Sequence, residues 1–305
     1  MRQWIVQAPI AVLALACVVR YGAAQSRPPP ERPVTATARS DTVKLTRAVI
    51  VERLASASEQ QPAALAGLDL SGLDLSRVDF KRANLSGARL VRTNLSGAQM
   101  FGVTLNRAIA READFSGAVL DISVLRGADL TGANLRDASL YAVVAIGADF
   151  TDADLSGARL IGALTDAKLV RTKLVRTHLG ADPANQPMGL MRTDLTGADL
   201  TGADLQGADM RKVNLVRANL TKADLSGADL SGADVTDADV SATVFRAIRG
   251  REKIRGLDRV RNADKAIFHR PGTAIGPSAA DVRLTSPTID LGGPAQSASD
   301  HSRPG

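Results

Sequence analysis

The hydrophobic pattern of this chain has a period of five residues. It is clearest between Thr193 and Val240, where a large apolar residue occupies every fifth position. Ala usually stands two residues before it, Asp or Asn one residue before it, and Gly often two residues after it. These apolar centres are Leu195, Leu200, Leu205, Met210, Leu215, Leu220, Leu225, Leu230, Val235 and Val240.

A period of five fits neither a straight helix nor a flat strand. An α-helix turns about 100° per residue, so steps of five carry the leucines around the helix. In a strand, an odd step sends successive leucines to opposite faces. A chain that bends after each pentad keeps every leucine inside, and four pentads then close a square coil. Residues twenty positions apart would stack at a spacing of about 4.8 Å.

The remaining pentad positions agree with this geometry. The residue two before the centre points inward near a corner, where Ala fits best. Gly tolerates positive φ at the turn, and small polar side chains hydrogen-bond to nearby backbone. We therefore predict an all-β solenoid whose structural core is the series from Leu195 to Leu230.

The repeated A(D/N)LxG signature resembles that of the pentapeptide-repeat family, over roughly Leu68 to Phe245. The resemblance implies a right-handed quadrilateral β-helix. Thirty-five centres correspond to about nine coils and a rod on the order of 40 Å long. We assign 68–246 to the repeats. Their register slips where Leu160 and Leu164 are four residues apart, and the loop 180–189 interrupts them.

The N-terminal flank has the features of an export signal. Residues 1–24 combine Arg2, an apolar stretch over 5–19 and a small-residue cleavage site before Gln25. An uncleaved membrane anchor through residues 5–19, or lipidation at Cys17, are the alternatives. After cleavage the chain would hold no stable membrane span and no cysteine.

The segments around the repeats are assigned to linkers, caps and a tail. Residues 25–40 are a Pro-rich linker, and 41–67 an N-terminal cap with a short helix. In that helix we expect Asp41 as N-cap and Leu45, Val49 and Leu54 along one side. Apolar residues spaced by three from Ile254 to Ala266 predict a helical or irregular cap within the basic segment 247–270. Residues 271–305 have little apolar content, and we predict a disordered tail there.

Little in the sequence indicates catalysis. The three histidines, His178, His269 and His301, have no metal-ligand spacing, and His178 replaces the Asp or Asn of a repeat, so we expect it on the surface. The periodic Asp residues are explained by turn formation, and no phosphate-binding loop is present. We expect no enzyme activity, no cofactor and no metal site.

The charge pattern gives little support to a DNA mimic, although some relatives in this family imitate DNA at type II topoisomerases. The segment from Leu68 to Arg246 holds 22 acidic and 20 basic residues, and its arginines interrupt any column of carboxylates. The two flanks carry +4 each, so together with −2 in the repeats they give the net charge of +6. A basic flank favours a protein or an anionic envelope component as partner. Nucleic acid ranks last, because the basic residues of the flanks are not interleaved with aromatic residues for base stacking.

The loop 180–189 is the feature that the repeat does not require. By resemblance to family members in which a loop contacts the partner, the candidate partner-binding residues are Asp182, Asn185, Gln186 and Met188; the alternative is an insertion that only restores the register. Family members often form a homodimer through the C-terminal end. We expect a periplasmic or secreted interaction or structural module, with a cytoplasmic gyrase-binding protein as the alternative.

Overall fold

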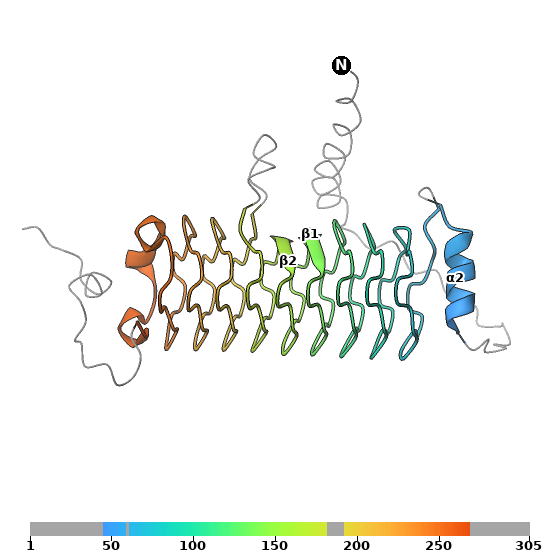
Figure 1. Ribbon diagram of the computed structural model, residues 1–305, viewed down its shortest axis with the longest axis horizontal. Coiled ribbons are helices and arrows are strands. Elements are labelled where there is room, and N and C mark those ends of the chain that lie inside the picture. Colours follow the sequence, from blue (N-terminus) through green and yellow to red (C-terminus); the bar gives the residue numbers. More distant parts are fainter. Residues whose placement is uncertain (1–44, 59–60, 182–191, 269–305) are drawn as a thin grey trace, which may run out of the picture.

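The computed structural model describes residues 45–58, 61–181 and 192–268. They form a straight rod of stacked four-sided coils, with a helix across one end (Figure 1). Most sides of the coils are held by single parallel residue pairs twenty positions apart, such as Ala64 with Asn84. The strands β1 (Ser139–Val144) and β2 (Arg159–Ala163) pair in parallel in the middle of the rod.

Four columns of these pairs run along the rod, one on each side. One column passes through ten rungs from Ala64 to Arg255. At about 4.8 Å a rung, its length agrees with the predicted rod of about 40 Å. The spacing falls to 19 residues between Asp149 and Lys168 and rises to 31 between Ala163 and Asp194. The columns continue through both irregularities, so the coils remain stacked.

The apolar centres fill the interior as predicted. Every centre from Leu195 to Leu230 is fully buried. Leu65 is fully buried as well, with Ala63 and Gly67 at the repeat spacing around it. The ladder therefore begins at Ala64, one repeat before the expected start at 68.

The hydrogen bonds of one pentad explain why Asp or Asn precedes the centre. In the five residues from Asp194 to Ala198, four backbone N–H groups donate to backbone carbonyls, for example that of Gly197 to Val216 at 2.9 Å. The fifth, at the corner residue Thr196, donates to the side-chain Oδ1 of Asp194 at 3.1 Å. The carboxylate thus satisfies the corner amide that the ladder leaves open.

The helix α2 (Arg47–Ala55) covers the first coil. Its N-cap is Thr46, whose side chain accepts a hydrogen bond from the Val49 amide, so the expectation of Asp41 as N-cap is wrong. Ile50 and Leu54 are the buried residues of α2, because side chains four residues apart lie on the same face of a helix. Val49, which was expected on that face, is only half-buried. Capping of this kind protects an open solenoid end.

The basic segment at the other end forms one further coil with six residues on each side. The rungs Arg249, Arg255, Arg261 and Ile267 continue the columns, six residues apart. Each side holds a short 3-10 helix: η2 (Arg251–Lys253), η3 (Leu257–Arg259) and η4 (Ala263–Lys265). The apolar spacing that suggested a helical cap therefore belongs to a continuation of the solenoid.

The acidic residues of the last coils are stabilised in their charged form. Partial burial by itself raises the pKa of Asp229, Asp234 and Asp239. Hydrogen bonds from the following Ser or Thr and the charge of nearby arginines outweigh this effect, and each pKa lies below its usual value.

We predict that Leu205→Ala lowers the free energy of unfolding by about 2–5 kcal/mol, because it leaves a cavity in a packed interior. Urea denaturation followed by circular dichroism measures this loss. The matched control is Gln206→Ala, since this neighbouring side chain is exposed. Equal stability of the two variants would contradict the assignment of the core.

We predict that the rod loses stability below about pH 4. A carboxyl whose pKa is lower in the folded state stabilises the fold above its unfolded pKa, and this contribution disappears as the pH falls through the folded pKa. The variant Asp229→Asn/Asp234→Asn/Asp239→Asn keeps the turn acceptors but not the charges, so its Tm should fall less on acidification. Glu52→Gln on the exposed side of α2 is the control. A triple variant with the same pH profile as the wild type would refute this origin.

Candidate interaction surface

The interior of the coils leaves almost no room for a ligand. The space among the apolar residues at the C-terminal end of the core measures about 10 Å³, which is the room of one water molecule. A hollow of about 310 Å³ lies between the end of α2 and the first coil, but it is open to solvent. Within the described part of the chain, the outer surface of the rod is therefore the candidate region for binding.

Within residues 45–58, 61–181 and 192–268, no group of three or more His, Cys, Asp or Glu side chains could hold a metal ion. His178 lies exposed on a rung between Arg159 and Asp209, facing outward as expected. The same part of the chain contains no helix long and apolar enough to cross a membrane.

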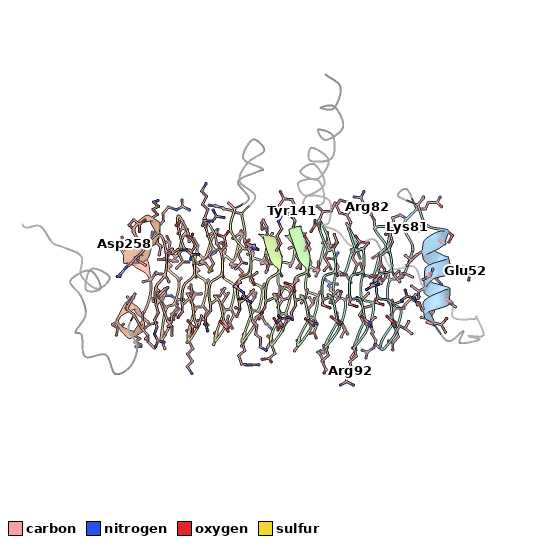
Figure 2. The ribbon with its side chains drawn as sticks, in the orientation of Figure 1. Glu52, Lys81, Arg82, Arg92, Tyr141 and Asp258 are labelled. Carbon is pink, nitrogen blue, oxygen red and sulfur yellow. The ribbon has the colours of Figure 1, made fainter. Side chains whose placement is uncertain are left out.

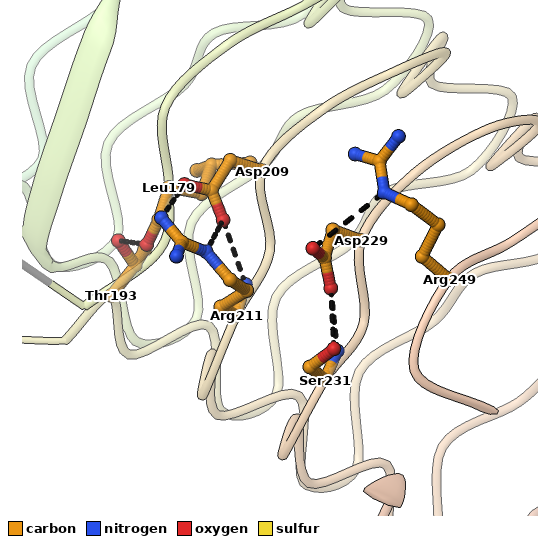
Figure 3. Close-up of polar contacts among 7 residues, drawn as sticks. All are labelled: Leu179, Thr193, Asp209, Arg211, Asp229, Ser231 and Arg249. Carbon is orange, nitrogen blue, oxygen red and sulfur yellow. Dashed lines mark hydrogen bonds and ion pairs between the residues drawn. The ribbon is translucent and has the colours of Figure 1, made fainter. Parts of the chain in front are cut away.

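The predicted partner-binding residues Asp182, Asn185, Gln186 and Met188 lie outside the described residues. The structure shows how the coil closes on either side of them. Thr193 donates from its hydroxyl to the carbonyl of Leu179 at 2.6 Å, and Figure 3 shows this contact beside the Asp209–Arg211 pair. A buried hydroxyl thus ties the chain that resumes after the loop to the coil that precedes it.

Ion pairs between successive coils neutralise much of the outer surface. The Arg92 side chain donates to Glu112 at 2.7 Å, and the guanidinium of Arg171 bonds both carboxylate oxygens of Asp152. The hydrogen bond and the charge of Arg92 hold the pKa of Glu112 below its usual value. Charges of both signs therefore alternate along the rod.

The acidic residues of the last coils are engaged by the protein itself. Asp209 bonds Arg211 in two places, while Asp229 accepts from Ser231 and lies 3.6 Å from Arg249 (Figure 3). The basic cap also pairs Arg255 with the carboxylate below it. The local negative field that a DNA mimic would need is thus partly cancelled by the cap.

Two departures from the pentad rule fall on one corner of the rod, in consecutive coils. The first is the four-residue step after Leu160, which shifts the register of the β1–β2 pairing after Tyr141. The second is the insertion after Leu179. Both are visible in the sequence, but only the stacking of the coils places them together. A corner that repeatedly departs from the repeat is a candidate for recognition.

The C-terminal end is a second candidate surface. Ile254, Leu257 and Val260 are only partly buried there, and the ring of Phe268 stacks on Phe245 at 5.7 Å. The homodimer through this end stays a prediction.

Comparisons with known proteins match the repeats rather than the flanks. The family model described as pentapeptide repeats (8 copies) matches residues 63–97, 98–137, 123–162, 133–180, 190–227 and 208–246. No curated protein matches the chain significantly.

Solved structures of repeat proteins overlap the rod. The chain is 28% identical to HetL of Nostoc sp. strain PCC 7120, a pentapeptide repeat protein involved in heterocyst differentiation regulation, over 66% of this chain and 85% of HetL, with a TM-score of 0.47. It is 17% identical to a trypsin-treated form of QnrB1, a plasmid-mediated fluoroquinolone resistance protein, over 65% and 91% of the two chains, with a TM-score of 0.42.

The family assignment rests on the repeat match, which spans more than half of the chain and coincides with the ladder that begins at Ala64. The chain belongs to the pentapeptide-repeat family, whose members fold as right-handed quadrilateral β-helices.

Proposed function

We propose that this protein is an exported, non-enzymatic interaction or structural module of the cell envelope. The observation that carries the proposal is the filled interior: the apolar centres occupy the coils, so ligand recognition is left to side chains on a rigid outer surface. Repeat solenoids commonly present such extended surfaces to partner proteins.

The proposal of export rests on residues 1–24. Their positive start, apolar middle and small residues before Gln25 match a cleavable signal. The partner would be a protein or an anionic envelope component, met by the rod surface, by the loop residues near Asp182 or by the basic C-terminal coil. A homodimer through that coil is compatible with this arrangement.

The alternative is a cytoplasmic protein that binds gyrase by imitating DNA. The ion pairs of the last coils argue against this alternative. Arg211, Arg249 and Arg255 lie beside carboxylates there and offset the negative charge that imitation of DNA requires. Export would also separate the protein from any topoisomerase.

We predict that the chain expressed in a bacterial host is recovered from the periplasm with an intact mass that begins at Gln25. Mass spectrometry of fractionated cells measures both properties. The variant Ala24→Glu places a large charged residue at the cleavage site, and its product should keep residues 1–24.

A full-length product in the cytoplasm would overturn the proposal, and inhibition of gyrase supercoiling by that product would establish the alternative. A membrane fraction carrying a lipid mass at Cys17, or an uncleaved chain held through residues 5–19, would replace the soluble periplasmic form by an anchored one.

A further inference from the structure

One wall of the rod carries apolar residues where the repeat usually carries Asp or Asn. Its outward column runs through Thr104, Val124, Val144 and Ala163, which are bridged to one another in successive coils. In the same coils, the three other columns mix polar side chains such as Gln99, Asp114 and Asp129 with the single apolar residues Ile109 and Val119. The wall differs from them because two valines follow one another in its column.

Apolar side chains at the adjoining corners widen this surface. Phe101 is 43% exposed, and Ile122 and Tyr141 follow it along the same corner, half-exposed. The Ile122 amide donates to the Tyr141 carbonyl at 2.7 Å, which places the two in neighbouring coils. We define the apolar wall as Phe101, Ile122, Val124, Tyr141 and Ile146; Val144 lies in the same column but is buried.

Turn formation does not account for these residues. Asp or Asn before a centre would bond the corner amide within its own coil, and Val cannot. The Arg126 amide instead bonds Oδ1 of Asn106 at 3.1 Å, and the Tyr141 amide bonds Oδ1 of Asp121 at 2.9 Å, both from the preceding coil. The corner amides are thus satisfied by an alternative route that keeps the wall apolar.

Basic side chains border the wall. The guanidinium of Arg82 lies 6.0 Å from the centre of the Phe101 ring, and Lys81 precedes it on the same corner. Arg107 and Arg126 stand on the opposite corner of the wall, in adjacent coils. Among the described residues these four cations make no ion pair, unlike Arg92 or Arg171 elsewhere on the rod. Figure 2 shows Lys81, Arg82 and Tyr141 along one edge and Arg92 along the opposite edge.

We propose that the apolar wall is the docking surface for an acidic amphipathic segment of another protein. Apolar anchors of that segment pack on Phe101, Ile122 and Val124, and its carboxylates pair with the cations at both corners. This inference rests on the proposed role as an interaction module and names the class of partner. It does not depend on the compartment in which the protein works.

The positive charge at the border of the wall favours an acidic segment of another protein as the occupant. The four border cations attract a negative segment, and Asp121 on the same corner is engaged by the Ser139 hydroxyl and the Tyr141 amide. A second copy of this chain would bring the same four cations to the contact. The apolar residues 5–19 of the chain itself offer no carboxylate to pair with them.

The test uses the full chain and a synthetic fluorescent peptide of Leu, Ala and Glu, with Leu at helical spacing. The variant Phe101→Ser/Val124→Asp restores the residue types common at these repeat positions, so it should fold with an unchanged or higher Tm. We expect this variant to weaken peptide binding at least tenfold, roughly the loss caused by removing one central anchor of an interface. Arg82→Ser/Arg126→Ser should weaken binding and reduce its dependence on salt.

The matched control is Val51→Ser on α2, which removes another exposed apolar side chain, 42% exposed, far from the wall. A peptide with Lys in place of Glu should not bind. Equal binding of the acidic peptide to the wild type and to Phe101→Ser/Val124→Asp, or no binding to either, would overturn the proposal.

One other result would also overturn it in favour of a different occupant. Sedimentation that shows a dimer of the wild type, lost in Phe101→Ser/Val124→Asp, without peptide binding, would assign the wall to a second copy. Every outcome leaves the proposed envelope role to be decided separately by the intact mass and the compartment.

Discussion

The backbone ladder between successive coils is the interaction on which this molecule depends. In the five residues from Asp194 to Ala198, four backbone amides bond to other backbone groups, and the fifth, that of Thr196, bonds to the side chain of Asp194. Since each coil contacts only its neighbours, the conformation of each coil is stabilised by hydrogen bonds to the coils directly before and after it. The apolar centres add the hydrophobic free energy, but their positions follow from the same five-residue geometry.

The outer surface is free to vary because the ladder and the core make few demands on it. The position before a centre is occupied by Asp or Asn in most repeats, and by Arg, Lys, His or Val in others. Asn106 and Asp121 provide acceptors for corner amides from the coil below. Polar pairs between coils and an apolar wall can therefore occur on the same backbone. The residues that stabilise the fold lie in the ladder and the core, whereas the residues available for recognition lie on the outer surface.

The sequence predicts the fold because its period is short and repeated. The centres from Leu195 to Leu230 and the outward position of His178 follow directly from that period. The predicted repeats begin one pentad late, because Leu65 lies in the segment assigned to the cap, although Ala63 and Gly67 carry the signature. The last coil does not follow from the pentad pattern because its period is six, and Ile254, Leu257, Val260 and Ala266 also fit helical spacing. The candidate surfaces were harder to predict, because residues such as Phe101, Val124 and Tyr141 come together only when coils are stacked.

The six-residue sides of the last coil give the rod two unlike ends. A helix lies across the first coil, while the coil that ends with Phe268 differs in side length from every pentad coil before it. The six-residue coil still pairs with the pentad coil before it, so a change of side length does not by itself interrupt the ladder. Open sheet edges usually invite growth into filaments. Because α2 covers the first coil, the end of another rod would meet a helix there instead of an open edge, and the walls of the rod are the surfaces left to contact partners.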